Sequence, residues 1–373
     1  MDDTVHPYLD HQRAVPYHLS IRAAAPFTVE MSAKKVSVHL DPAAASPQSR
    51  GERILFIGLP YYSYTDSIVE SLVKKGFTVE YFPSETRTFW SKTIRKFLPR
   101  IYRSMLWKYH ARIVTKARNS RYDYVFFLQI HTLAKEHVER LRSSQPTAKF
   151  ILYNWDSLST HDYRPYRCYL DSIFTFDRDD AATLSGCYLP LFALPGYFEA
   201  SHSDTPSNDI YFVASIGTLE RFAAVRKFAD YCRGENIRFA KHMHCSPAVF
   251  IMLLRKGLYM RGMTLRALST DEILRLMNKS AAVFDFPNRP QSGYTMRLIE
   301  NMCAGKKIVT SNARVRGETF YSEDQFFVVE NQEYSGLKAF LKSETQGTTT
   351  GPPREVRYSE FTLDRWLHSI FGK

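Results

Sequence analysis

Residues 286–312 read FPNRPQSGYTMRLIENMCAGKKIVTSN and predict, in order, a loop, a helix and a buried strand. Two prolines and a glycine punctuate the polar part that precedes the helix. Apolar residues then recur at helical spacing over residues 294–304, and Gly305 is a typical helix stop. The β-branched run at residues 308–310 resumes as a strand. The start of the helix therefore points toward whatever lies over the sheet.

The rest of the chain repeats an alternation of strand and helix. Short apolar runs, the expected strands, lie at residues 54–57, 77–82, 124–128, 150–153 and 173–176. After a polar, turn-rich stretch, further expected strands lie at residues 210–213, 237–240, 282–284, 308–310 and 326–329. Such alternation is typical of parallel sheets covered by helices on both faces. We therefore predict an α/β protein of two doubly wound, Rossmann-like domains.

The composition and the turn-rich breaks predict the limits of these domains. Residues 1–50 are rich in Ala, Pro, Ser and His without a sustained period, which is typical of a flexible leader. The predicted parts are a leader at 1–50, a first domain at 51–201, a linker at 202–208, a second domain at 209–345 and a tail with a terminal helix at 346–373.

The 286–312 segment resembles the donor-nucleotide segment of GT-B glycosyltransferases. In that family an acidic residue inside the helix binds the ribose hydroxyls of a sugar nucleotide, and Glu300 matches it here. The resemblance implies that the two domains face each other across a cleft and that the terminal helix crosses back to the first domain. Further residues that we expect to contact the donor lie at the start of the helix: Gly293, Tyr294, Thr295 and Arg297.

The segment departs from the family pattern at Ser292. Many retaining members have a second Glu eight positions before the ribose-binding one, so the stereochemistry of transfer stays open. Gly293 and Tyr294 still match the Gly-aromatic pair that follows that position. The alternative for Glu300 is a solvated helix residue, but it lies among apolar neighbours on a helix that we expect to be largely buried.

Residues 209–228, DIYFVASIGTLERFAAVRKF, predict a strand, a small-residue turn and a helix. Gly217 allows close approach of a ligand, the helix start presents free N–H groups, and Arg221 supplies a forked cation. The segment resembles the opening of the nucleotide domain in glycosyltransferases similar to spore-maturation and capsule-type proteins, where such a turn and Arg meet the donor diphosphate. We predict the same contacts for Gly217 and Arg221. The alternative for Arg221 is a surface helix residue.

Two residues of the first domain are candidates for the base that activates an acceptor hydroxyl. Asp156 lies in the polar loop YNWDSLSTHDY, residues 153–163, which follows the fourth expected strand, and His131 follows the third. A carboxylate can accept or orient the hydroxyl proton, and an imidazole titrates near neutrality. The structural alternatives are a turn-forming Asp156 and a hydrogen-bonded His131 at a strand end.

The formal net charge is +12, and the excess is concentrated in one segment. Residues 87–122 contain eleven Lys or Arg, no Asp or Glu, and six interleaved aromatic residues before Tyr122. This pattern predicts either an interfacial helix at residues 87–118 on an anionic membrane, or a long helix that buries its aromatics in the domain. No nucleic-acid-binding motif accompanies the charge, so we expect no nucleic-acid partner.

Several sequence features indicate the compartment and the absence of cofactors. The five cysteines lack metal-ligand or CxxC spacing, which is typical of reduced cytoplasmic thiols. The N-terminus lacks the basic segment and the following hydrophobic segment of a secretory signal. No apolar run is long enough to span a bilayer. Asp179 and Asp180 begin an expected helix, where carboxylates are favoured by the helix dipole and need no metal to explain them. We therefore expect a cytoplasmic protein, either soluble or peripheral on the inner face of the plasma membrane, with no metal and no cofactor besides its donor.

These observations and the resemblance predict a metal-independent GT-B glycosyltransferase. It would move a sugar from a nucleotide-sugar donor to a hydroxyl of a glycan or lipid-linked acceptor, in bacterial envelope polysaccharide synthesis such as that of lipopolysaccharide or capsule. The alternatives are a GT-B-fold epimerase or polyol-phosphate transferase, and a catalytically silent subunit of an envelope complex.

Overall fold

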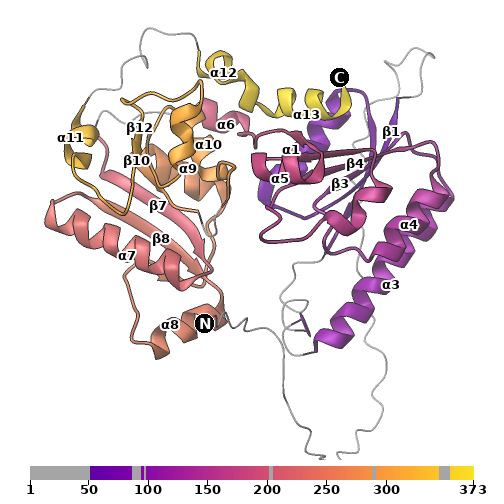
Figure 1. The fold of residues 1–373 in the computed structure, drawn as a ribbon, viewed down its shortest axis with the longest axis horizontal. Coiled ribbons are helices and arrows are strands. Elements are labelled where there is room, and N and C mark those ends of the chain that lie inside the picture. Colours follow the sequence, from indigo (N-terminus) through magenta and orange to yellow (C-terminus); the bar gives the residue numbers. More distant parts are fainter. Residues whose placement is uncertain (1–50, 86–93, 96–97, 201–204, 288–290, 344–352) are drawn as a thin grey trace, which may run out of the picture. The chain divides into compact units, whose positions relative to one another are not determined.

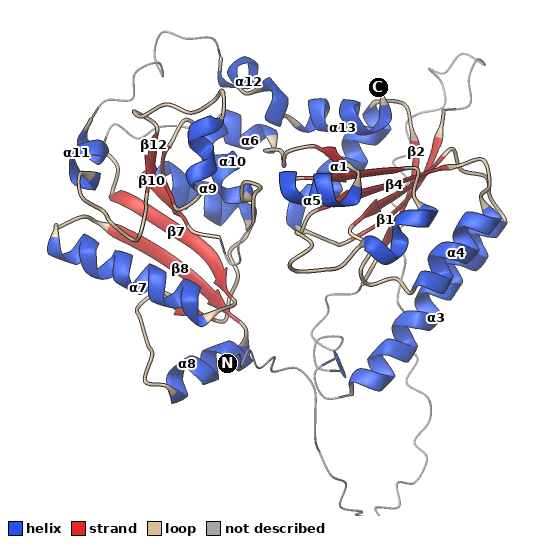
Figure 2. Ribbon diagram, viewed as in Figure 1, coloured by secondary structure: helices blue, strands red, loops and turns tan. Residues whose placement is uncertain are grey.

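The computed structural model describes residues 51–85, 94–95, 98–200, 205–287, 291–343 and 353–373. The described strands form two six-stranded sheets, every pairing in them is parallel, and helices flank each sheet (Figures 1 and 2). This arrangement confirms the predicted α/β fold with two doubly wound halves. The leader predicted at residues 1–50 lies outside the described residues.

The first sheet has the order β2-β1-β3-β4-β5-β6. Its strands are β1 (Arg53–Gly58), β2 (Thr78–Pro83), β3 (Tyr124–Leu128), β4 (Lys149–Asn154), β5 (Ser172–Thr175) and β6 (Cys187–Tyr188). Its helices are α1 (Tyr62–Lys74), α3 (Pro99–Arg118), α4 (Lys135–Ser144) and α5 (Arg178–Leu184). The central strands β1, β3 and β4 are almost wholly buried, because helices cover both faces of the sheet. The order reverses at β1, so ligands are expected beyond the carboxyl ends of β1 and β3.

The second sheet has the order β12-β11-β10-β7-β8-β9. Its strands are β7 (Asn208–Ile216), β8 (Phe239–Cys245), β9 (Met263–Thr264), β10 (Ser280–Asp285), β11 (Lys307–Thr310) and β12 (Phe326–Val328). Its helices are α7 (Leu219–Gly234), α8 (Pro247–Arg255), α9 (Thr270–Asn278), α10 (Met296–Cys303) and α11 (Leu337–Lys342). The order reverses between β7 and β10, which brings the starts of α7 and α10 to the same edge of the sheet.

A short helix, α6 (Pro195–Phe198), precedes the second sheet. Another, α12 (Arg354–Arg357), precedes the last helix, α13 (Leu363–Phe371). α13 packs on the first sheet: Phe371 contacts Tyr124 and Phe126, and the Trp366 ring lies 4.7 Å from that of Tyr153. The end of the chain thus completes the core of the first half.

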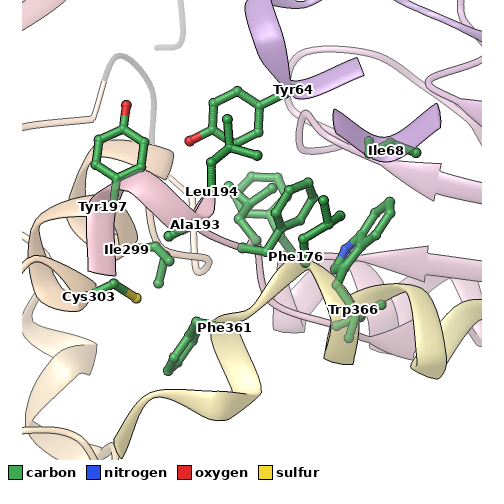
Figure 3. Packing of buried hydrophobic residues seen from close by; sticks show 14 of the residues in the cluster. Tyr64, Ile68, Phe176, Ala193, Leu194, Tyr197, Ile299, Cys303, Phe361 and Trp366 are labelled. Carbon is green, nitrogen blue, oxygen red and sulfur yellow. The ribbon is translucent and has the colours of Figure 1, made fainter. Parts of the chain in front are cut away.

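One hydrophobic cluster contains residues of both sheets (Figure 3). Tyr64, Phe176 and Trp366 belong to its part around the first sheet, and Ile299 and Cys303 come from α10. The predicted domain limits remain a proposal, since residues 201–204 of the expected linker lie outside the described ranges and β7 already begins at Asn208.

Candidate functional site

A cavity of about 410 Å³ lies where residues that follow strands of both sheets come together. Its volume is in the range of small-molecule sites. The first half contributes residues that follow β1 and β4, among them Tyr61 and Asp156. From the second half, the cavity is lined at the starts of α7 and α10 by Arg221, Thr295, Arg297 and Glu300. The structure therefore brings together five of the residues that the sequence predicted for the site.

Thr295 positions the helix that carries Glu300. Its hydroxyl accepts a hydrogen bond from the N–H of Leu298 at 3.1 Å and so caps α10. The same hydroxyl donates to Asp285 Oδ1 at 2.5 Å, and Thr310 donates to Asp285 Oδ2 at 3.0 Å. Burial raises the pKa of Asp285, and these hydrogen bonds oppose the rise only in part. The end of β10 and the start of α10 are thereby fixed to each other.

Glu300 is a buried member of the cavity wall, with 2% of its surface exposed. Its carboxylate accepts hydrogen bonds from the Tyr64 hydroxyl on α1 and from the Arg297 guanidinium one turn away. Burial and the neighbouring Glu300 charge both raise the pKa of Tyr64, so its hydroxyl remains protonated and can donate. Glu300 is therefore not the solvated helix residue that the sequence left as an alternative.

Two guanidiniums of the cavity wall have unused donors. Arg221 donates through Nη1 to the Ser215 carbonyl at 3.0 Å, while its buried Nε has no partner among the described residues. The buried Nε of Arg297 also has no partner there. Burial lowers the pKa of Arg221 to about 10, so the side chain stays cationic at neutral pH. Forked donors of this kind suit the oxygens of a phosphate group.

Three of the predicted donor residues do not line the cavity. A Cβ at Gly293 would lie 2.3 Å from the Phe176 carbonyl oxygen, so a glycine permits the loop to pack against the end of β5. Tyr294 is buried and donates a hydrogen bond to Glu318 at 2.7 Å. Gly217 lies directly before Thr218, the residue that caps α7. Donor contacts for these three residues remain predictions.

Ser292 contacts the first half of the chain. Asp177, at the end of β5, accepts hydrogen bonds from the Ser292 hydroxyl, from the Ser292 N–H at 2.7 Å and from the Gly293 N–H at 3.2 Å. Burial opposes ionisation of Asp177, but these bonds outweigh it and lower its pKa. A glutamate at position 292 would place a second carboxylate against Asp177. The contact with Asp177 therefore favours a serine over a glutamate at position 292.

In the first half of the chain, Asp156 is held in place by a neighbouring amide. Gln129 Nε2 donates to Asp156 Oδ2 at 2.6 Å, and His161 Nε2 lies 3.9 Å from the same oxygen. Asp156 also lines a smaller cavity of about 120 Å³, together with Gln129 and residues that follow β1 and β3. Tyr61, Trp155 and Asp156 line both cavities, so the two spaces adjoin.

His131, the rival candidate base, does not reach the cavity. It lines neither cavity, and its ring stacks on His161 with 3.6 Å between ring centroids. His161 in turn lies beside Asp156. The structure thus brings both candidate bases into one cluster but places only Asp156 at the cavity.

Comparisons with known proteins support the fold alone. No protein-family model matches the sequence, and no match is found among curated proteins. A sucrose-phosphate synthase from Thermosynechococcus elongatus is similar in structure, with a TM-score of 0.53 at 12% identity over 85% of this chain and 97% of that one. Staphylococcus aureus MnaA in complex with UDP has a TM-score of 0.51 at 11% identity, over 86% of this chain and 96% of that one. AviGT4, a glycosyltransferase involved in avilamycin A biosynthesis, has a TM-score of 0.50 at 11% identity, over 86% and 99%. The fold is GT-B.

Within this GT-B structure, sequence reasoning missed three residues of the site. Tyr64, Gln129 and Asp177 were not predicted, although Gln129 follows β3 as Asp156 follows β4. The positive φ of Gln129, 63°, is visible only in the structure.

Within the described ranges, no group of three or more His, Cys, Asp or Glu side chains could hold a metal ion. Metal-independent chemistry remains a prediction for this GT-B chain.

Proposed function

We propose that this chain is a glycosyltransferase that moves a sugar from a nucleotide-sugar donor to a hydroxyl of a glycan or lipid-linked acceptor, in bacterial envelope polysaccharide synthesis. The observation that carries the proposal is the lining of the larger cavity, which contains the Glu300 carboxylate, paired with Arg297, and two guanidiniums, Arg221 and Arg297, whose Nε donors have no partner among the described residues. The GT-B fold, which the UDP complex of MnaA shares, supports nucleotide binding by this cavity.

The donor would bind along this wall. The two oxygens of Glu300 can accept hydrogen bonds from both ribose hydroxyls, and Arg221, Arg297 and the helix starts beside them can hold the diphosphate. When the sugar leaves, negative charge develops on the diphosphate. Fixed cations and helix N-termini stabilise that charge without a metal ion.

The acceptor would enter from the smaller cavity. As the acceptor hydroxyl oxygen attacks the anomeric carbon, Asp156 takes its proton, and the bond between that carbon and the diphosphate oxygen breaks with its electron pair on the diphosphate. Gln129 orients the carboxylate through the 2.6 Å hydrogen bond. His131 is the alternative base, which would act through His161.

The basic segment at residues 87–118 includes α3, whose second half is partly buried and whose first half is mostly exposed. The second half of α3 buries Tyr109, Ile113 and Ala117, as an internal packing helix would. Ahead of it, Leu98 and Ile101 are each 51% exposed and Trp107 42%, among the exposed cations Arg100, Arg103 and Lys108. Residues 86–93 and 96–97 of the predicted segment lie outside the described residues.

We propose that this first half of α3 binds an anionic membrane surface, which would make the protein peripheral on the inner face of the plasma membrane. Cations attract anionic head groups while Trp and Ile enter the boundary with the acyl chains. In the parts of the chain that the structure describes, no helix has the length and apolarity needed to cross a bilayer. Arg100→Gln with Arg103→Gln should reduce sedimentation with anionic vesicles, and equal sedimentation of parent and variant would contradict this role.

Isothermal titration with nucleoside diphosphates tests the donor site. Glu300→Ala should weaken the best ligand at least about tenfold, since charge-assisted hydrogen bonds contribute roughly 1.5–3 kcal/mol each. Arg221→Gln should weaken the diphosphate but leave the affinity for the free nucleoside unchanged, because the nucleoside lacks the phosphates. Circular-dichroism melts check that both variants fold. Unchanged diphosphate affinity in folded Glu300→Ala would contradict the proposal.

Product analysis separates the remaining alternatives. A glycosyltransferase releases nucleoside diphosphate only when an acceptor gains the sugar. An epimerase instead changes the donor sugar itself, and a polyol-phosphate transferase releases nucleoside monophosphate. Unchanged donor after long incubation with intact envelope lipids would favour a silent subunit.

A further inference from the structure

The helix α8 has an apolar sequence, and among the described residues only one side of it packs on the core, through Val249, Phe250, Met252 and Leu253. Pro247–Arg255 reads PAVFIMLLR, with no polar side chain before Arg255. A helix that is apolar on all sides is normally buried. Here Leu253 is its one buried residue, whereas Ile251 is 47% exposed and Leu254 46%. α8 thus exposes side chains whose burial would be favourable.

Two further exposed apolar side chains lie close in sequence, Tyr259 between α8 and β9 and Leu265 directly after β9. Tyr259 is 62% exposed and Leu265 56%. Of the nine large apolar side chains that are exposed in the described residues, four lie between residues 251 and 265. Singly scattered exposed apolar residues are ordinary, but a concentration of this kind marks an interaction surface. We name Ile251, Leu254, Tyr259 and Leu265 the α8 surface.

The charge around the α8 surface has one sign. Residues 236–270 contain six Lys or Arg and no Asp or Glu. Three of these cations, Arg255, Lys256 and Arg261, are exposed within the stretch that carries the α8 surface. A fourth, Arg266, is paired with Glu272 at 2.7 Å. A partner for this region must therefore be apolar where it meets the side chains and negatively charged around them.

We propose that the α8 surface binds an anionic phospholipid bilayer. Arg and Lys can bury their alkyl stems and keep their charges at the head groups, and Tyr prefers the boundary between head groups and acyl chains. The cores of protein interfaces are depleted in Lys, whereas cations without carboxylates match an anionic head-group layer. This site is separate from the first half of α3, and two weak membrane contacts give firmer attachment than either alone.

The position of the α8 surface affects how a lipid-linked acceptor would reach the larger cavity. Ala267 and Leu268, two and three residues beyond Leu265, line the larger cavity. Binding of the α8 surface to a bilayer would hold that side of the cavity close to the head groups. A lipid-linked acceptor would then reach the cavity without leaving the membrane. This consequence rests on the proposed function, but the membrane binding itself does not.

The test measures sedimentation of the full chain, without nucleotide, with vesicles of phosphatidylcholine alone and of phosphatidylcholine mixed with phosphatidylglycerol. Ile251→Ser with Leu254→Ser should weaken binding to the mixed vesicles about tenfold, since two partly exposed aliphatic side chains no longer enter the lipid. The matched control is Val356→Ser on α12, because Val356 is also exposed, at 62%. It should bind as the parent does.

A second readout reports contact with lipid directly. Tyr259→Trp adds an indole to the α8 surface, and phospholipids brominated in their acyl chains should quench its fluorescence beyond the quenching seen in the parent. Each variant is also measured with Arg100→Gln and Arg103→Gln, so that α3 does not mask the effect. Circular-dichroism melts confirm folding.

Two results would overturn the inference. One is equal vesicle binding by the Ile251→Ser/Leu254→Ser variant and the Val356→Ser control, with no added quenching. The other is self-association of the parent that the double variant loses, since the α8 surface would then bind a second copy of the chain. Nucleotide affinity is measured separately, so the vesicle result can be interpreted even if the proposed function is wrong.

Discussion

The Tyr64 hydroxyl donates a hydrogen bond to the Glu300 carboxylate, although 236 residues separate them in sequence. Tyr64 lies on α1 beside the first sheet, and Glu300 lies on α10 beside the second. The carboxylate that we assign to the ribose therefore already has a donor from the other half of the chain. A ribose hydroxyl that binds Glu300 has to replace this donor or share the carboxylate with it.

Tyr64→Phe should strengthen nucleoside diphosphate binding by roughly tenfold. A hydrogen bond to a charged group, which contributes roughly 1.5 kcal/mol, would no longer have to be broken when the ribose binds. The free energy of unfolding without ligand should fall by a similar amount. Titration calorimetry and urea unfolding measure the two effects. If the variant binds nucleotide more weakly than the parent, Tyr64 contacts the ligand and does not compete with it.

Asp156→Asn should lower turnover by about 10²- to 10⁴-fold, the usual contribution of a general base. Donor affinity should not change, because Asp156 lies on the acceptor side. Gln129→Leu should give a smaller loss of turnover, since the base remains but its orientation does not. Steady-state kinetics with donor titration measure both. Near-normal turnover in Asp156→Asn, with a large loss in His131→Ala, would transfer the role to His131.

Asp177→Ala should lower the free energy of unfolding by about 3 kcal/mol. The change removes the cap of α5 and leaves the buried N–H groups of Ser292 and Gly293 without their acceptor. Ser292→Ala should have a smaller effect, because the two backbone N–H bonds remain. Urea unfolding compares the variants. Equal stability of parent and Asp177→Ala would show that this contact does not hold the loop in solution.

Asp180→Asn should stabilise the protein at neutral pH but not at low pH. Burial and the neighbouring Asp177 and Asp179 raise the pKa of Asp180 to about 6, although the Leu158 N–H opposes the rise. The folded state therefore binds this proton more tightly than the unfolded state, and the parent loses stability as pH rises from about 4 to about 6. Above that range the variant should be more stable by roughly 1 kcal/mol, after allowance for solvent screening of a partly exposed carboxylate.

The control for this pH dependence is Asp162→Asn. Hydrogen bonds from Arg164 lower the pKa of Asp162, so the sign of its effect is reversed. Urea unfolding at a series of pH values measures both variants. A stability difference for Asp180→Asn that is constant from pH 4 to 7 would contradict the assignment.

The sequence predicts strands well where apolar runs are continuous. The expected third strand at residues 124–128 coincides with β3, Tyr124–Leu128. The expected strand at 237–240 begins and ends earlier than β8, Phe239–Cys245, because the polar residues Lys241, His242 and His244 interrupt the apolar pattern of this strand. The two-residue strands β6 and β9 were missed, since they are too short to show a period and form only by pairing with a neighbour.

The sequence predicts that residues shortly after a strand or in the first turns of a helix come together, and their roles remain predictions. Asp156, Arg221 and Glu300 reach one cavity because parallel strands and their helices converge at one edge of each sheet. The partners of these residues could not be predicted. The contact of Asp177 with Ser292 spans 115 residues, and neither spacing nor composition carries such information.

The packing of α13 on the first sheet has a consequence for the order of synthesis. Tyr124, Phe126 and Tyr153 belong to the part of the chain that a ribosome makes first, whereas Phe371 and Trp366, which cover them, belong to the last helix. Domains usually fold in the order in which they emerge. Here an aromatic face of the first half stays uncovered until α13 has been translated.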